Sequence, residues 1–184
     1  MCRDYARRPV SPMIRVWGIP PEKPVVARLL GLARARRATV ALLLAEVVEP
    51  LGDLALLTPE PLSALADRIR GGRRTDVEEA STTLRAIPAL QQDEEPNGPA
   101  FFALGAVVAW IYAADTVLNP DDDKAIRQTY SRVNDVLYFV EDQLAIGGLC
   151  DRLYGAVTEA ARGDDRAVIA LRGSVEGLVE ALRT

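Results

Sequence analysis

The longest apolar stretch of the chain predicts a buried central helix. Every residue from Phe101 to Ala114 is apolar, glycine or tyrosine, so this stretch has no polar face. A helix that is apolar all round must be surrounded by other helices or by lipid. Crossing a bilayer takes about 20 consecutive apolar residues, whereas Asn97 precedes this run and Asp115 ends it. We therefore expect residues 99–118 to form the central helix of an all-α, single-domain bundle.

Amphipathic segments on both sides of residues 99–118 predict the helices that surround it. Between Asn119 and Ile146 the apolar residues follow the 4-3-4-3-4 spacing of a heptad seam: Ile126, Tyr130, Val133, Leu137, Val140 and Leu144. Such a seam packs nearly antiparallel to a neighbouring helix at a shallow angle. No stretch alternates with period two over the length of a strand. Further helices are expected at 25–31, 33–49, 59–70, 75–86, 149–162 and 164–182, which gives a bundle of about seven to eight helices.

Capping residues and glycines predict where these helices begin and end. Side-chain oxygens at a helix N-terminus accept hydrogen bonds from free backbone N–H groups, and proline is tolerated at the first helical position. Glycine is favoured just past a helix C-terminus. We accordingly expect N-caps at Thr58, Thr75 (in a capping box with Glu78), Asn97 and Asn119, and helix stops at Gly71–Gly72 and Gly147–Gly148.

Residues 1–24 contain five prolines and are expected to form an irregular basic arm in front of one all-helical domain at residues 25–184. The first 40 residues carry a net charge of +7, so the net charge of −4 for the whole chain leaves −11 on the remainder. A basic arm could bind nucleic acid, but an acidic body repels phosphate backbones. The sequence therefore disfavours a nucleic-acid partner and favours contact of the arm with its own body, or with a second copy in a homodimer.

The composition excludes several classes of catalytic and metal site. The chain has no histidine, which removes imidazole bases, Ser-His-Asp and Cys-His constellations and histidine-containing zinc sites. A calcium loop starting at Asp121 would need glycine and glutamate at its sixth and twelfth positions, where Ile126 and Arg132 stand. Helix capping is the favoured role of Asp121–Asp123. We expect no metal, no cofactor and no catalytic residue, and we favour a protein that is not an enzyme.

The cysteines and the N-terminal residues indicate the compartment. Cys2 and Cys150 are far apart in sequence and form neither a CxxC pair nor a disulfide framework, which is typical of a reducing compartment. The first residues lack the apolar core of a signal peptide. We expect a cytoplasmic protein with no membrane segment.

Three acidic residues fall in or beside apolar sequence: Glu46, Asp115 and Asp135. A carboxylate in apolar surroundings is costly unless it is paired. The abundant arginines favour arginine–carboxylate pairs at these positions. The alternative, which the sequence leaves open, is a polar pocket beside the central helix that binds a ligand through Glu46, Asp115 and Tyr112.

Two clusters of arginines are candidates for binding an acidic partner: Arg34, Arg36 and Arg37, and Arg73 and Arg74 together with Arg68 and Arg70. Positive charge at the start of a helix is unfavourable by a few tenths of a kcal/mol or more per residue. The first cluster stands at the start of the helix expected at 33–49. These arginines therefore need partners inside the protein or a binding role that compensates.

The order of the segments resembles that of a known family. VVARLLGLA at 25–33 is followed by ALLLAEVVEP at 41–50, by TDVEEASTTLRAIP at 75–88, by an acidic loop, and by FFALGAVVAWIYAADTVLNPDDDKAIRQTYSRVNDVLYFVE at 101–141. Over about residues 25–145 this layout resembles the YjaG-like family of small helical bacterial proteins, a domain of unknown function. The resemblance implies an all-helical fold and a bacterial cytoplasmic setting, and it supplies no active site.

Size, acidity and the missing catalytic chemistry favour a non-enzymatic bacterial protein that binds another protein. One version is an immunity or defence-associated protein that sequesters a basic, nucleic-acid-cleaving toxin, because complementary charge raises association rates. The alternative is a bundle that binds or converts a small ligand in a carboxylate–arginine pocket beside the central helix.

Overall fold

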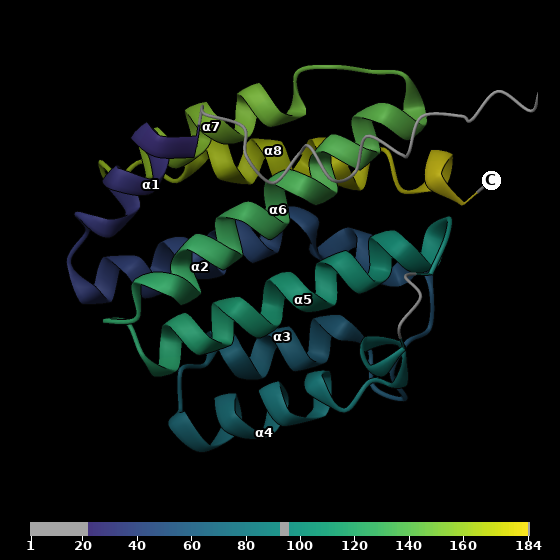
Figure 1. Ribbon diagram of the computed structural model, residues 1–184, viewed down its shortest axis with the longest axis horizontal. Coiled ribbons are helices and arrows are strands. Elements are labelled where there is room, and N and C mark those ends of the chain that lie inside the picture. Colours follow the sequence, from purple (N-terminus) through teal and green to yellow (C-terminus); the bar gives the residue numbers. More distant parts are fainter. Residues whose placement is uncertain (1–21, 93–95, 184) are drawn as a thin grey trace, which may run out of the picture.

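The structure is a computed structural model that describes residues 22–92 and 96–183, and within these ranges it is all-α with no strand. The helices are packed as a bundle around one central helix (Figure 1). The α-helices are α1 Glu22–Leu30, α2 Arg34–Val48, α3 Leu62–Arg70, α4 Arg74–Arg85, α5 Pro99–Leu118, α6 Asp123–Leu144, α7 Leu149–Ala160 and α8 Arg166–Glu176. Short 3₁₀ helices are η2 Glu49–Leu54, η3 Pro88–Gln91 and η4 Glu180–Leu182.

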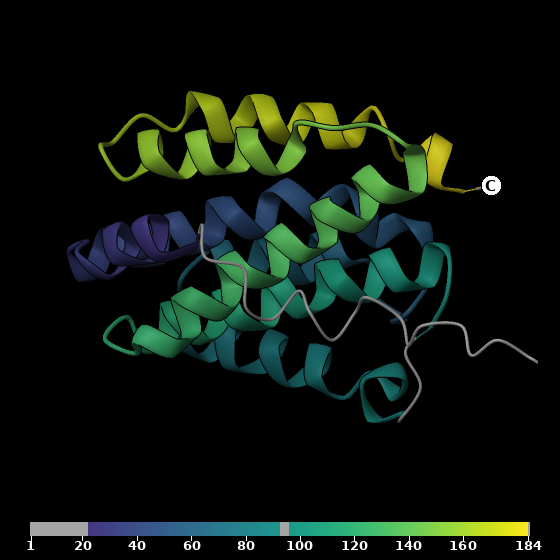
Figure 2. The same ribbon diagram turned by 45° about the horizontal axis from the view of Figure 1, so that its top comes forward.

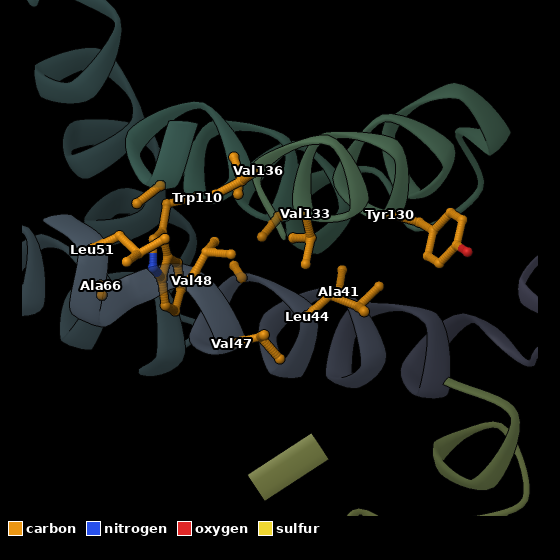
Figure 3. Packing of buried hydrophobic residues seen from close by; sticks show 14 of the residues in the cluster. Ala41, Leu44, Val47, Val48, Leu51, Ala66, Trp110, Tyr130, Val133 and Val136 are labelled. Atoms are coloured by element: carbon orange, nitrogen blue, oxygen red, sulfur yellow. The ribbon is translucent and has the colours of Figure 1, made fainter. Parts of the chain in front are cut away.

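The apolar run forms α5, which lies at the centre with α2, α4, α6 and η2 around it. Its largest side chain, Trp110, is fully buried and packs among Leu51, Ala66 and Val48 (Figure 3). By length and composition α5 could cross a membrane, but within this fold 67% of its most apolar window is buried by the other helices. This confirms the central helix at residues 99–118 and the all-α bundle around it.

α6 packs along α5 and runs in the opposite direction (Figure 1). The heptad residues from Ile126 to Val140 are buried, and Tyr130 and Val133 point toward α2 (Figure 3). The close approach of the two helices depends on Gly105, because a Cβ there would lie 2.4 Å from Cγ2 of Val136. The heptad pattern therefore identified the face of α6 that enters the core.

The hairpin of α7 and α8 forms an outer layer on the side of α2 and α6 (Figure 2). Arg36 of α2 donates from Nε to the carbonyl of Ala160 at 3.0 Å and also pairs with Asp165, at the two ends of the α7–α8 turn. The carboxylate of Glu141 on α6 accepts hydrogen bonds from the backbone N–H groups of Leu149 and Cys150, which caps α7.

The predicted N-caps are wrong at four helices. Thr58 donates its hydroxyl hydrogen bond to the carbonyl of Glu60, and α3 begins at Leu62, because a residue before a proline, here Glu60, avoids the helical region. α4 begins at Arg74 with no capping box. Gly98 stands at the N-cap of α5 instead of Asn97.

The third aspartate of the acidic run begins α6, three residues later than predicted. Asn119 ends α5, and Asp122 caps α6 by accepting a hydrogen bond from the N–H of Lys124 at 2.8 Å. The glycine stop at Gly71–Gly72 is confirmed, since Gly71 caps α3 and Gly72 follows with φ of +68°. The stop predicted at Gly147–Gly148 is wrong, because α6 ends at Leu144 with Ala145 in the left-handed conformation, and Gly148 stands at the N-cap of α7. The last helix is shorter than expected: α8 ends at Glu176, and the short 3₁₀ helix η4 follows it.

The predicted arm at residues 1–24 falls mainly outside the described residues. Residues 22–24 are the first turn of α1, where a proline is tolerated because its missing N–H would have no helical partner. The helical domain therefore begins slightly before residue 25.

Candidate functional site

The most buried carboxylate of the described residues, Glu49, lies where α2 ends. Pro50 has no backbone N–H, and the chain tightens there from α2 into the 3₁₀ helix η2. Glu46 and Glu49 are three residues apart, so both side chains lie on one face of the helix. Glu49 is only 7% exposed. This junction therefore places two carboxylates at the edge of the core.

Arg70, at the end of α3, joins three carboxylates. Its Nε donates to Glu46 at 2.8 Å, one terminal nitrogen donates to Asp67 at 2.5 Å, and the other donates to Glu49. Burial acts to lower the pKa of Arg70, but the hydrogen bond with Glu46 and the charge of Glu49 outweigh it and raise that pKa above its ordinary value. The guanidinium is therefore charged at every accessible pH and holds the junction together.

The guanidinium of Arg70 also covers the central helix. Its carbon lies 4.9 Å from the centroid of the Trp110 ring, the distance of a cation–π contact. The indole Nε1 of Trp110 is buried and has no hydrogen-bond partner among the described residues. The ionic junction is thus in direct contact with the most buried aromatic residue of the core.

Glu49 has a second, weaker cationic neighbour. Arg172 of α8 approaches it at 3.7 Å, whereas the Nε of Arg172 is buried without a partner among the described residues. Burial raises the pKa of Glu49 above its ordinary value of 4.5, and the charges of Arg70 and Arg172 offset this only in part. The carboxylate of Glu49 is the most buried charge of the junction, and its two arginine neighbours do not fully offset its burial.

A surface pocket of about 380 Å³ opens over Glu49 between η2, α3, α8 and η4. We call it the Glu49 pocket. Four carboxylates and two arginines line it: Glu49, Asp53, Glu176, Glu180, Arg172 and Arg183. Arg183 is already paired with Glu180 at 3.2 Å. The pocket thus presents an excess of negative charge that comes from segments far apart in the sequence.

A second pocket of about 190 Å³ lies on the other side of Asp53. We call it the Leu56 pocket, because Leu56 at its rim is 89% exposed, the largest value among the big apolar side chains of the described residues. Its wall is mainly apolar and includes Leu57, Leu62 and Val107. The two pockets share Asp53 and differ in chemistry.

The described residues offer no other obvious reactive centre. They contain no group of three or more acidic or cysteine side chains that could hold a metal ion. Burial, together with Glu141, raises the pKa of the Cys150 thiol to about 12. A thiol that stays protonated is a poor nucleophile. The charged junction and its two pockets are therefore the candidate site.

The three residues predicted for a ligand pocket take different places in the structure. Glu46 lies in the junction and pairs with Arg70, as expected for an arginine–carboxylate pair. Asp115 pairs with Arg85 of α4, which donates to its two oxygens at 2.7 and 2.6 Å. Tyr112 is half-buried on α5 and packs against the core. The two carboxylates thus have separate arginine partners, and Glu46 alone belongs to the junction.

The five arginines predicted for partner binding fall into two groups. Arg36 and Arg37 have side chains only 25% and 14% exposed, and both are bonded to backbone carbonyls and carboxylates within the protein. Arg34, Arg73 and Arg74 have side chains 74–79% exposed, each with one carboxylate partner. The latter three remain accessible to a partner.

Sequence reasoning missed the residues that shape the Glu49 pocket. Glu49 precedes Pro50, so it was interpreted only as the end of a helix. The i, i+3 spacing from Glu46 was the available signal. Arg172, Glu176 and Glu180 reach the pocket from the other end of the chain, which local patterns do not reveal.

No protein-family model, no curated protein and no solved structure matches this chain. The resemblance to the YjaG-like family therefore stays a prediction, and the function has to be argued from the site itself.

Proposed function

We propose that this protein is a non-enzymatic binding protein that takes a basic side chain of a partner protein into the Glu49 pocket. The observation that carries this proposal is the arrangement of charge: the buried carboxylate of Glu49 lines an open pocket together with Asp53, Glu176 and Glu180. Arginine is the side chain best suited to such a site, because its planar guanidinium binds carboxylates through two parallel hydrogen bonds.

The negative charge of residues 41–184 supports the same partner. Residues 41–184 carry −11, which attracts basic proteins over distance and raises their association rate. Sequestering a basic, nucleic-acid-cleaving toxin, as an immunity protein does, is one version of this proposal. A bacterial and cytoplasmic setting would suit it.

The proposal can be tested by selection from a displayed library of random peptides. We expect the protein to enrich peptides that contain arginine or lysine. The variant Glu176→Lys/Glu180→Lys should lose this enrichment, because it reverses two charges at the pocket. The control Glu78→Lys/Glu79→Lys makes the same change of charge on the exposed face of α4 and should keep it.

Two results would contradict the proposal. Equal enrichment by both double variants would show that net charge, rather than the pocket, selects the peptides. Tight binding of free arginine in calorimetry, with no enriched peptide, would favour the alternative function of a small-ligand-binding bundle.

A further inference from the structure

We infer that the Glu49 pocket and the Leu56 pocket form one docking surface, which takes a partner segment with an apolar side chain next to a basic one. This inference rests on the proposed function and specifies the partner segment further. Its basis is that Asp53 of η2 lines both pockets, so an acidic site and an apolar site adjoin at this residue.

The wall between the two pockets is held by tight packing. Gly52 lies so close to α3 that a Cβ there would be 2.4 Å from Cδ2 of Leu62 and 3.2 Å from its Cβ. Leu51, the preceding residue, is fully buried. Because η2 is fixed on both sides, the two pockets keep one relative position and can read two neighbouring side chains of a partner together.

The apolar half of the surface has an exposed side chain that lacks cover. Leu56 leaves 89% of its surface in water beside a pocket whose wall includes Leu57, Leu62 and Val107. Covering this surface removes apolar area from water, which favours association. A volume of about 190 Å³ has room for one aliphatic side chain of a partner.

Charge complementarity decides the occupant. An anionic or purely apolar segment would leave the carboxylates of Asp53 and Glu176 without a cationic partner beneath it, which is costly. A segment with arginine beside leucine satisfies both halves, since the guanidinium reaches the Glu49 pocket while the aliphatic side chain covers Leu56. Interfaces of this kind combine an apolar anchor with a charge-assisted hydrogen bond.

Four blocked peptides test the inference by calorimetry with the full chain: Gly-Gly-Arg-Leu-Gly-Gly, its Leu-Arg order, Gly-Gly-Arg-Gly-Gly-Gly, and the first peptide with neutral citrulline in place of arginine. We expect the better of the two Arg/Leu orders to bind at least tenfold more tightly than the leucine-free peptide. The citrulline peptide should bind at least tenfold more weakly than the arginine peptide of the same order. The variant Leu56→Ser should abolish the advantage of leucine, whereas the control Ile169→Ser, which removes another exposed apolar side chain, should keep it.

The outcomes separate this inference from the proposed function. Equal binding of the Arg/Leu and leucine-free peptides, both better than citrulline, would overturn the composite surface and leave the acidic site standing. Absence of binding by all four would overturn both. A peptide of this chain's own residues 13–17, Met-Ile-Arg-Val-Trp, that bound more tightly than the designed peptides would assign the surface to the chain's own arm and overturn a partner protein as its occupant.

Discussion

At both ends of α2 the charged side chains have the sign that the helix dipole disfavours. Arginines stand at the N-terminal end, where the dipole is positive, and glutamates at the C-terminal end, where it is negative. At the first end, Arg36 donates to a carbonyl at the C-terminus of α7, and Arg37 donates to the carbonyls of Leu30, the last residue of α1, and Leu32 just beyond it. These carbonyls lie at the negative ends of other helices, so the cations there are compensated inside the protein.

The C-terminal end of α2 is compensated less completely. Glu46 and Glu49 share Arg70, and Arg172 stays 3.7 Å from Glu49. This end also opens into a pocket with further carboxylates. In α2, the charges opposed to the helix dipole are therefore the ones that make ion pairs and hydrogen bonds to other helices. The proposed binding role belongs to the C-terminal end, where Arg172 lies farther from its carboxylate.

The largest expected effect comes from removing the ion pairs of Arg70 at the C-terminal end of α2. Arg70→Ala should lower the free energy of unfolding by about 3 kcal/mol, because removing one partner leaves a buried charge, here Glu49, without its main compensation. Urea unfolding measures this. The control Arg74→Ala removes an exposed pair with Glu78 and should cost less than about 1 kcal/mol. Equal losses in the two variants would show that Glu49 does not depend on Arg70.

Removing the bonds of Arg36 at the N-terminal end of α2 should lower the free energy of unfolding by less and should affect a smaller region. Arg36→Ala should cost about 2 kcal/mol, since hydrogen bonds to charged groups contribute about that much. Hydrogen exchange should increase around the α7–α8 turn, where Arg36 contacts Ala160 and Asp165. Faster exchange in α3 and α4 with an unchanged turn would contradict the role of Arg36 as the tie to the hairpin.

Glu49, at the C-terminal end of α2, should also make the free energy of unfolding depend on pH. Because its pKa is raised in the folded protein, the native state binds this proton more tightly than the unfolded state does. The free energy of unfolding contributed by Glu49 is then fully present below the ordinary pKa of 4.5 and is lost as the pH rises through the folded value.

Urea unfolding of the wild type and of Glu49→Gln between pH 3.5 and 7 tests this sign. The stability of the wild type relative to the variant should decrease as the pH rises, since glutamine does not titrate. A relative stability that increases with pH would mean that pairing with Arg70 outweighs burial and that the C-terminal end is as well compensated as the N-terminal end.

The sequence was sufficient for the architecture where one strong pattern decided it. The bounds of α5 follow from an uninterrupted apolar run, and the buried face of α6 follows from its heptad spacing. The predicted helix starts were wrong because a polar side chain such as Thr58 can form its hydrogen bond within a turn as well as at a helix N-terminus. Whether a residue serves as an N-cap also depends on neighbouring prolines and on ion pairs with other helices, and intrinsic helix propensity takes neither into account.

The candidate site was predictable only in part. Glu46 stood out as a carboxylate within apolar sequence, and the sequence led us to expect that an arginine would pair with it. The identity of that partner, Arg70, depends on how α3 packs against the end of α2. Arg172 and Glu180 join the site through α8 and η4, so the excess of negative charge around Glu49 exists only in the folded chain.

The smallest effect is expected at Arg34, the exposed arginine of the N-terminal end. Its side chain is 75% exposed and pairs with Asp121, which is itself 61% exposed, so Arg34→Ala should change the free energy of unfolding by less than about 1 kcal/mol. The variant should also leave binding of arginine-containing peptides unchanged within twofold, because a basic partner segment avoids this end. If Arg34→Ala weakened peptide binding as strongly as Glu176→Lys/Glu180→Lys, the interface would lie at the basic end of α2 and the assignment of binding to the acidic end would be wrong.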